Sequence, residues 1–269
     1  MEIISLALLL ILSFAIYFFL SMVGLGGGML VVPMLILVFE IPPSIAIGTS
    51  LFAMSISTFA ATMGYWSRQS VNWKLALAYN VFDIPGIILG ALLTKIAPTA
   101  VLEFICGCGI IVLAIVVLTK KSIQKRSASI ANQEAEDDNF YEPDFSFAWT
   151  GKNLIVVIFS SFMGGLITGM VGIGGGTVDT TSMISIGIPM NYAAGSSSLA
   201  MFMTNIFGAV THISLGNIWW DYAIPLGIVA LIAAFLGSRL APKLNSTMLR
   251  KMLGIIALIT GLRLAFNIL

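Results

Sequence analysis

The sequence predicts an all-α polytopic membrane protein made of two repeats, each with about five transmembrane segments. Hydrophobic residues make up 58% of the 269-residue chain, charged residues make up 9%, and the mean hydropathy is +1.03. The apolar runs are long, as membrane-spanning helices require, and lack the alternating pattern of an outer-membrane barrel. Landmark residues of the first half also recur in the second half at a nearly constant spacing.

Each half contains five apolar segments. The N-terminal run lacks the basic residues and cleavage site of a signal peptide, so we expect it to remain as the first span. The expected segments are 3–23, 29–39, 44–66, 75–94 and 101–118, then 154–171, 177–188, 191–213, 222–238 and 248–268. The second segment of each half is much shorter than the roughly 20 residues that cross a bilayer. We therefore expect two half-helices that begin deep in the membrane.

A polar stretch, 120–153, separates the two halves. It begins with four basic residues and continues with six acidic residues, half of the twelve in the protein. Such a composition is typical of a solvated linker. The predicted organisation is a first transmembrane repeat over 1–119, a charged linker over 120–153 and a second transmembrane repeat over 154–269.

Two glycine-rich turns are the strongest evidence for a duplication. Gly-Leu-Gly-Gly-Gly at 24–28 is matched by Gly-Ile-Gly-Gly-Gly at 172–176, and Met-Val precedes both. At an offset of 147 residues, Pro42, Gly48, Trp73, Gly90 and Gly107 then match Pro189, Gly195, Trp220, Gly237 and Gly254. Internal repeats of this kind are typical of secondary transporters.

The basic residues predict that the two repeats have opposite orientations. If all ten segments cross the membrane, two basic residues lie outside, Lys95 and Arg263. The other eleven lie inside: Arg68, Lys74, Lys120, Lys121, Lys125, Arg126, Lys152, Arg239, Lys243, Arg250 and Lys251. With four spans per half, the split falls to eight against five. Because cytoplasmic loops are enriched in Lys and Arg, we expect inverted repeats and a cytoplasmic linker.

The glycine turns predict an anion-binding site. A helix that begins at Gly28 or Gly176 presents unpaired N–H groups and the positive end of its dipole. Glycine lets an anion approach these groups closely. The expected substrate-binding glycines are Gly26, Gly27, Gly28, Gly174, Gly175 and Gly176. The alternative is that they only permit close helix packing.

Hydroxyl side chains extend this candidate site. Thr49 and Ser50 follow Gly48, and Ser196 and Ser197 follow Gly195. Their hydroxyls can donate to the oxygens of an anion without adding charge. The alternative is that they bond to carbonyls of their own helices.

Two acidic residues lie within apolar segments, where ionisable groups are candidates for function. Asp83 is our candidate for proton coupling, and its alternative role is to satisfy backbone groups freed by Pro85. Asp179, with Thr177, is assigned to the substrate region, and its alternative role is to cap the half-helix.

The duplicated glycine turns, Val31-Val32-Pro33, the two hydroxyl clusters and the charged linker resemble the sulfite exporter TauE/SafE family, also called the toluene sulfonate uptake permease (TSUP) family. The resemblance covers nearly the whole chain outside 120–150. It implies a plasma-membrane carrier of small sulfur-containing anions such as sulfite, thiosulfate or organosulfonates. The glycine and hydroxyl positions of the family carry over to the residues named above.

The chain departs from the family pattern after the second glycine turn. The first copy continues Met29-Leu30-Val31-Val32-Pro33, whereas the second continues Thr177-Val178-Asp179-Thr180-Thr181. A carboxylate and three hydroxyls replace an apolar turn. This difference favours another ligand, or a coupling cation, over sulfite itself.

Other function classes find little support in the sequence. There is no P-loop, and a single histidine, His212, expected at the membrane interface, gives no hydrolase triad. Cys106 and Cys108 indicate neither a metal site nor a disulfide, and a net charge of +1 gives no reason to expect a nucleic-acid partner. We therefore expect no enzymatic activity, cofactor or metal. The expected partners are a small anion and the lipid bilayer, and a homodimer is compatible with the sequence.

The expected function is secondary transport by alternating access, with a proton as a candidate coupling ion. Two alternative functions would use the same anion site. One is a passive anion channel, in which the glycine turns line a filter, and the other is a carrier of a small carboxylate without sulfur. A third is a membrane scaffold that docks partners through the acidic linker.

Overall fold

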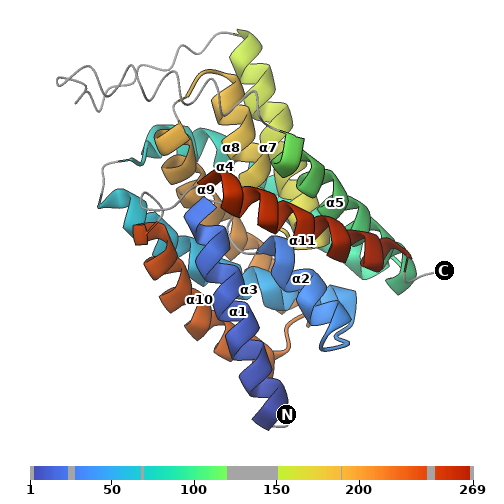
Figure 1. The fold of residues 1–269 in the computed structure, drawn as a ribbon. Helices are drawn as coiled ribbons and strands as arrows, with labels where there is room; N and C mark the ends of the chain where they lie inside the picture. Colours follow the sequence, from blue (N-terminus) through green and yellow to red (C-terminus); the bar gives the residue numbers. More distant parts are fainter. Residues whose placement is uncertain are drawn as a thin grey trace.

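The computed structural model describes residues 3–23, 28–67, 70–119, 151–188, 190–240 and 246–266, and this part of the chain contains ten α-helices (Figure 1). They are α1 (Ile3–Val23), α2 (Gly28–Leu37), α3 (Pro43–Trp66), α4 (Trp73–Ile96), α5 (Thr99–Thr119), α7 (Gly151–Val171), α8 (Gly176–Ser185), α9 (Met190–Ser214), α10 (Trp220–Leu240) and α11 (Ser246–Phe266). Every helix begins and ends within three residues of the segment that the sequence predicts. The prediction of an all-α fold is confirmed.

Local sequence explains several helix ends. Pro43 occupies the first position of α3, where its missing N–H and fixed φ cost nothing. The Asn72 side chain caps α4 by accepting a hydrogen bond from the Leu75 N–H, 3.2 Å away. Pro43 and Asn72 thus help to begin α3, which carries the first hydroxyl cluster, and α4, which carries Asp83.

In the described part of the chain, seven helices are long and apolar enough to cross a membrane: α1, α3, α4, α5, α7, α9 and α10. In contrast, α2 and α8 have ten residues each. At 1.5 Å per residue they are about 15 Å long, roughly half of the hydrocarbon core. The expected half-helices beginning at glycine are therefore present in both halves of the chain.

Side-chain burial follows the pattern of a membrane protein. Large apolar residues such as Ile4, Ile96 and Ile155 point outward and are at least 69% exposed. Serine, threonine, asparagine and aspartate side chains are instead buried between helices. Trp66 and Trp73 are exposed at the facing ends of α3 and α4, as expected for an aromatic belt. The chain is a multi-pass membrane protein.

The helix packing repeats when the two halves are exchanged. Helix α1 packs on α10 and α7 packs on α4; α3 packs on α10 and α9 packs on α4. The half-helices α2 and α8 pack on α3 and α9, respectively, while α3 contacts α9 and α5 contacts α11. Figure 1 shows α1 beside α10, and α11 running from the end of α1 along α5. This arrangement agrees with a duplication, and the opposite membrane orientation of the halves remains a prediction.

Close glycine contacts position α4 against α7. A Cβ atom at Gly165 of α7 would overlap the carbonyl oxygen of Asp83 on α4. A Cβ atom at Gly90 of α4 would lie 3.0 Å from the Cα of Gly169. Because the backbones approach this closely, α4 places Asp83 beside the second half of the chain.

The predicted linker mostly lies outside the described residues, which exclude 120–150. Its last three residues, 151–153, were assigned to the linker because of their polarity but belong to the first turn of α7. The division of the chain into three regions otherwise stays a prediction.

Candidate functional site

The second glycine turn packs against the start of α2. Gly172 and Gly174 adopt φ angles of +69° and +79°, in the left-handed region that favours glycine. A Cβ atom at Gly28 would lie 2.5 Å from the carbonyl oxygen of Gly172. The structure therefore brings Gly28 of the first repeat against Gly172 of the second. Gly26 and Gly27, which the sequence also assigns to the site, lie outside the described residues.

Methionine side chains cover the starts of both half-helices. The Sδ atom of Met54 lies where a Cβ atom would be at Gly28, and that of Met201 lies where one would be at Gly176. Met54 and Met201 are 147 residues apart, so this contact follows the duplication. Residues 172–176, which include the predicted Gly174, Gly175 and Gly176, are buried. The glycines pack closely in this conformation, and anion binding to them stays a prediction.

Two of the predicted hydroxyls join the repeats. Thr49 accepts a hydrogen bond from the Trp219 N–H at 3.1 Å, and Ser196 accepts one from the Asn72 N–H at 2.9 Å. The offset of 147 residues relates both the acceptors and the donors. Each hydroxyl thus holds the chain just before α4 or α10 of the other repeat, a role that the sequence did not indicate.

The other two hydroxyls contact the half-helix region of the second repeat. Ser50 donates to the carbonyl oxygen of Gly172 at 3.4 Å. The hydroxyls of Ser197 and Thr180 are 2.7 Å apart. Thr177 lies in the first turn of α8, but its side chain is not among those described. The predicted hydroxyls therefore surround the glycine turn and α8, with protein groups as partners.

Asp83 and Asp179 form a buried pair of carboxyl groups. Each side chain is 1% exposed, and the two groups are within hydrogen-bonding reach of each other. The hydroxyl oxygen of Thr204 lies 3.4 Å from Asp83 Oδ2, farther than from another acceptor, the Ala200 carbonyl oxygen at 3.0 Å. The Oδ1 atoms of Asp83 and Asp179 receive no hydrogen bond from a donor group in the described part of the chain. The sequence assigned these residues to separate roles, whereas the structure places them together.

Sequence analysis missed the polar groups around this pair. Thr204 also bonds Asn80 Oδ1 at 2.9 Å, and the Tyr79 hydroxyl lies 2.7 Å from that of Ser182. Tyr79, Asn80 and Asp83 are spaced to share one face of α4 inside an apolar segment. That spacing is a signal that could have identified them.

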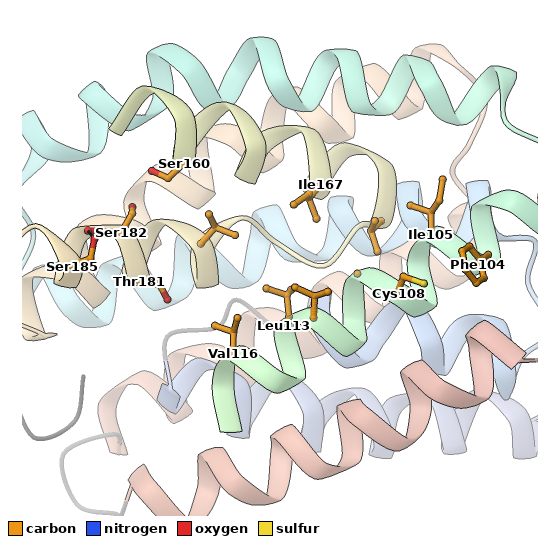
Figure 2. A pocket seen from close by; sticks show the side chains of 14 residues that line it. Phe104, Ile105, Cys108, Leu113, Val116, Ser160, Ile167, Thr181, Ser182 and Ser185 are labelled. Carbon is orange, nitrogen blue, oxygen red and sulfur yellow. Dashed lines mark hydrogen bonds between the residues drawn. The ribbon is translucent and has the colours of Figure 1, made fainter. Parts of the chain in front are cut away.

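A cavity of about 680 Å³ lies between α5, α7 and α8, and we call it the α5–α7–α8 cavity. Figure 2 shows its hydroxyl side chains, Ser160, Thr181, Ser182 and Ser185, at one end, with Phe104, Ile105 and Cys108 at the other. Val171 and Val178, on either side of the second glycine turn, also line it. The cavity therefore passes the turn and ends at the hydroxyls next to the carboxyl pair.

His212 is buried between helices near the end of α9, and its expected place at the membrane interface stays a prediction. Its Nε2 atom lies 3.3 Å from the carbonyl oxygen of Gly169, and its Nδ1 atom lies 3.4 Å from the Asn217 side-chain nitrogen. Packing of α9 on the end of α7 encloses the ring, which its position near a helix end did not indicate.

No group of three or more His, Cys, Asp or Glu side chains that could hold a metal ion occurs among the residues that the structure describes. Cys106 and Cys108 are free thiols.

The fold and its buried polar site define a helical membrane protein of the transporter class. Residues 9–264 match the family model described as sulfite exporter TauE/SafE, and the chain belongs to this family.

Curated relatives extend along most of the chain. It is 26% identical to "Probable membrane transporter protein YunE" of Bacillus subtilis over 258 residues, 92% of each chain. It is also 26% identical to "Probable membrane transporter protein MJ0441" of Methanocaldococcus jannaschii, over 96% of this chain and 94% of that one. "Sulfite exporter TauE/SafE family protein 5" of Arabidopsis thaliana matches a shorter stretch of 83 residues at 32% identity, 31% of this chain and 18% of that one. The names of these proteins describe transporters rather than enzymes. No solved structure matches the chain.

Proposed function

We propose that this protein is a secondary transporter, without enzymatic activity, that moves small sulfur-containing anions such as sulfite, thiosulfate or organosulfonates across the plasma membrane. The observation that carries the proposal is the contact between Gly28, at the start of α2, and Gly172 of the second glycine turn. The start of α2 in the first repeat thus lies against the glycine turn that precedes α8 in the second repeat. The N–H groups and dipoles of the half-helices attract an anion although the site carries no full positive charge. A Lys or Arg side chain in the site would bind the anion more tightly and hinder its release. Membership of the TauE/SafE family supports this substrate class.

In the proposed cycle the anion displaces the methionines from the helix starts. Met54 and Met201 cover Gly28 and Gly176 in this conformation. Methionine side chains are flexible and adapt to irregular spaces, so they can turn away when an anion enters. Movement of one repeat relative to the other would then expose the site to each side of the membrane in turn. In this cycle the repeats are inverted and the linker is cytoplasmic.

We further propose that a proton moves with the anion and that Asp83 binds it. Asp83 is buried on α4 and contacts Thr204 and Asp179, with no cation in contact in the described residues. A carboxyl group in such a place can alternate between a neutral and a charged form. Co-transport of a proton would reduce the net charge moved with each anion.

Uptake into proteoliposomes tests this function. Purified protein would be given sulfite, thiosulfate, sulfoacetate, taurine, sulfate or acetate, with and without an imposed pH gradient, and empty liposomes would serve as the control. We expect saturable accumulation and counterflow of at least one sulfur anion, driven by the gradient. Flux that neither saturates nor shows counterflow would indicate a channel. Uptake of acetate alone would indicate a carrier of carboxylates. The polar residues after the second glycine turn, where the chain departs from the family pattern, would then be the first place to look for the site of that ligand.

A further inference from the structure

We propose that Asp83 and Asp179 share one proton, and that this proton exchanges with the α5–α7–α8 cavity past the Tyr79 hydroxyl. The inference rests on the proposed function, in which Asp83 is the coupling group. It adds a partner carboxyl, a route for the proton and a side of entry.

The contact between the two carboxyl groups requires a proton. An ionised carboxylate only accepts hydrogen bonds, so two carboxyl groups can bond to each other only if one is protonated. Two like charges in contact at a buried site also strongly disfavour ionisation of both. Asp83 and Asp179 are 1% exposed and within hydrogen-bonding reach, and one oxygen of each receives no other hydrogen bond from the residues described. A shared proton satisfies both observations.

Among the described side chains of the surrounding helices, no cationic group is found in contact with the pair. The pair is enclosed by α4, α8 and α9, and α7 packs on α4 and α8. Tyr79 lies one helical turn before Asp83 on α4, and its hydroxyl contacts that of Ser182 on α8. Lys74 and Lys95 lie at the two ends of α4, and Tyr192 lies in the first turn of α9. His212 bonds Gly169 and Asn217 instead. Lys152 is in the first turn of α7, with a side chain outside those described.

Tyr79 connects the pair with the cavity. Its hydroxyl lies 2.7 Å from that of Ser182, and Ser182 and Ser160 both line the cavity. Tyr79 is one helical turn before Asp83 on α4, and Ser182 is three residues after Asp179 on α8. On the far side of Asp83, the Thr204 hydroxyl is held by Asn80. In this proposal, a proton therefore reaches the pair from the serine end of the cavity, which Figure 2 shows.

Infrared spectroscopy of the purified full chain in lipid nanodiscs, with no anion added, tests the shared proton. A protonated carboxyl gives a C=O band that a carboxylate lacks. We expect this band in the wild type at neutral pH and its loss in the double variant Asp83→Asn/Asp179→Asn. In either single variant, the C=O band of the remaining carboxyl should shift in frequency, because its partner changes from a carboxylate to an amide. The matched control Asp221→Asn, at an exposed position of α10, should leave the wild-type band unchanged.

Two results would overturn the shared proton: no such band in the wild type, or a single variant in which the remaining band keeps its frequency. If the asparagine variants do not fold, Thr204→Val keeps both carboxyls and removes the hydroxyl beside Asp83. An unchanged band in that variant would also contradict the proposal.

The rate of band change after a rapid pH jump tests the route. Tyr79→Phe should slow the change roughly a hundredfold, the lower end of what a positioned proton-transfer group contributes. Tyr17→Phe is the control, since Tyr17 is equally buried and its hydroxyl has no hydrogen-bond partner among the described residues. An unchanged rate in Tyr79→Phe would overturn the route through this residue. Because these measurements need no substrate, a wild type with the band but no anion uptake would contradict the proposed function and not the pair.

Discussion

Thr49 and Ser196 show how single hydroxyl groups connect the two halves of this protein. Each is fully buried and accepts a hydrogen bond from a backbone N–H of the opposite repeat, at Trp219 and Asn72 respectively. Hydroxyls following a glycine inside a transmembrane helix were expected to face an anion. Their observed partners give them a structural role, which can be separated from substrate binding by mutation.

Thr49→Val is expected to destabilise the protein by about 1 kcal/mol, because the Trp219 N–H loses its acceptor in a partly buried hydrogen bond. Thermal unfolding in detergent measures this change. Thr260→Val is the control, since the Thr260 hydroxyl bonds only carbonyls of its own helix among the bonds recorded for it. If Thr49→Val instead kept its stability and lost anion binding, Thr49 would be a substrate ligand as the sequence predicts.

At the scale of the helices, α2 and α8 have equal lengths and different chemistry. Helix α2 is apolar, and its residues from Gly28 to Ile36 are buried. Helix α8 instead carries Asp179, Thr180 and Ser182, which contact α4 and α9. The repeat partners of Asp83 and Asp179 are Ala230 and Val31. The carboxyl pair therefore exists once, although the half-helices occur twice, and its geometry depends on how α4 packs on α7.

Gly165→Ala is expected to separate α4 from α7, because the added methyl group would overlap the carbonyl oxygen of Asp83. Overpacking of this kind costs about 1–3 kcal/mol. Thermal unfolding and the carboxyl infrared band would report stability and the Asp83 environment. Gly151→Ala, at the start of the same helix with nothing within 4 Å of the added atom, should change neither. An unaltered Gly165→Ala protein would show that this contact does not position Asp83.

At the scale of the whole molecule, the packing can be described by exchanging the two halves. The pairs α1–α10 and α7–α4 are equivalent, as are α3–α10 and α9–α4. The same exchange relates the Thr49–Trp219 and Ser196–Asn72 hydrogen bonds. The distribution of Lys and Arg adds a prediction about orientation that the helix packing does not contain.

Lys74 and Asp221 are expected to lie on opposite sides of the membrane. They occupy equivalent positions 147 residues apart, and both are exposed. Lys74→Cys should react with a membrane-impermeant thiol reagent only from the cytoplasmic side, and Asp221→Cys only from outside, in a Cys106→Ala/Cys108→Ala background. Ser129→Cys in the predicted linker serves as the cytoplasmic reference. Reaction of both cysteines from one side would mean that the repeats are parallel.

The sequence by itself determined the fold class, the helix boundaries, the duplication and the family of this protein. These features depend on local properties: the length of apolar runs, the positions of proline and glycine, and motifs repeated along the chain. It also identified Asp83 and Asp179 as unusual, because charged groups are costly inside apolar segments.

Only the tertiary structure decided which of these residues meet. Asp83 and Asp179 are 96 positions apart in sequence, and they come together because glycines let α4 approach α7 closely. The same packing brings Tyr79 to Ser182 and gives Thr49 and Ser196 backbone partners in the other repeat. Such contacts depend on the distances between helices, which local sequence patterns do not contain.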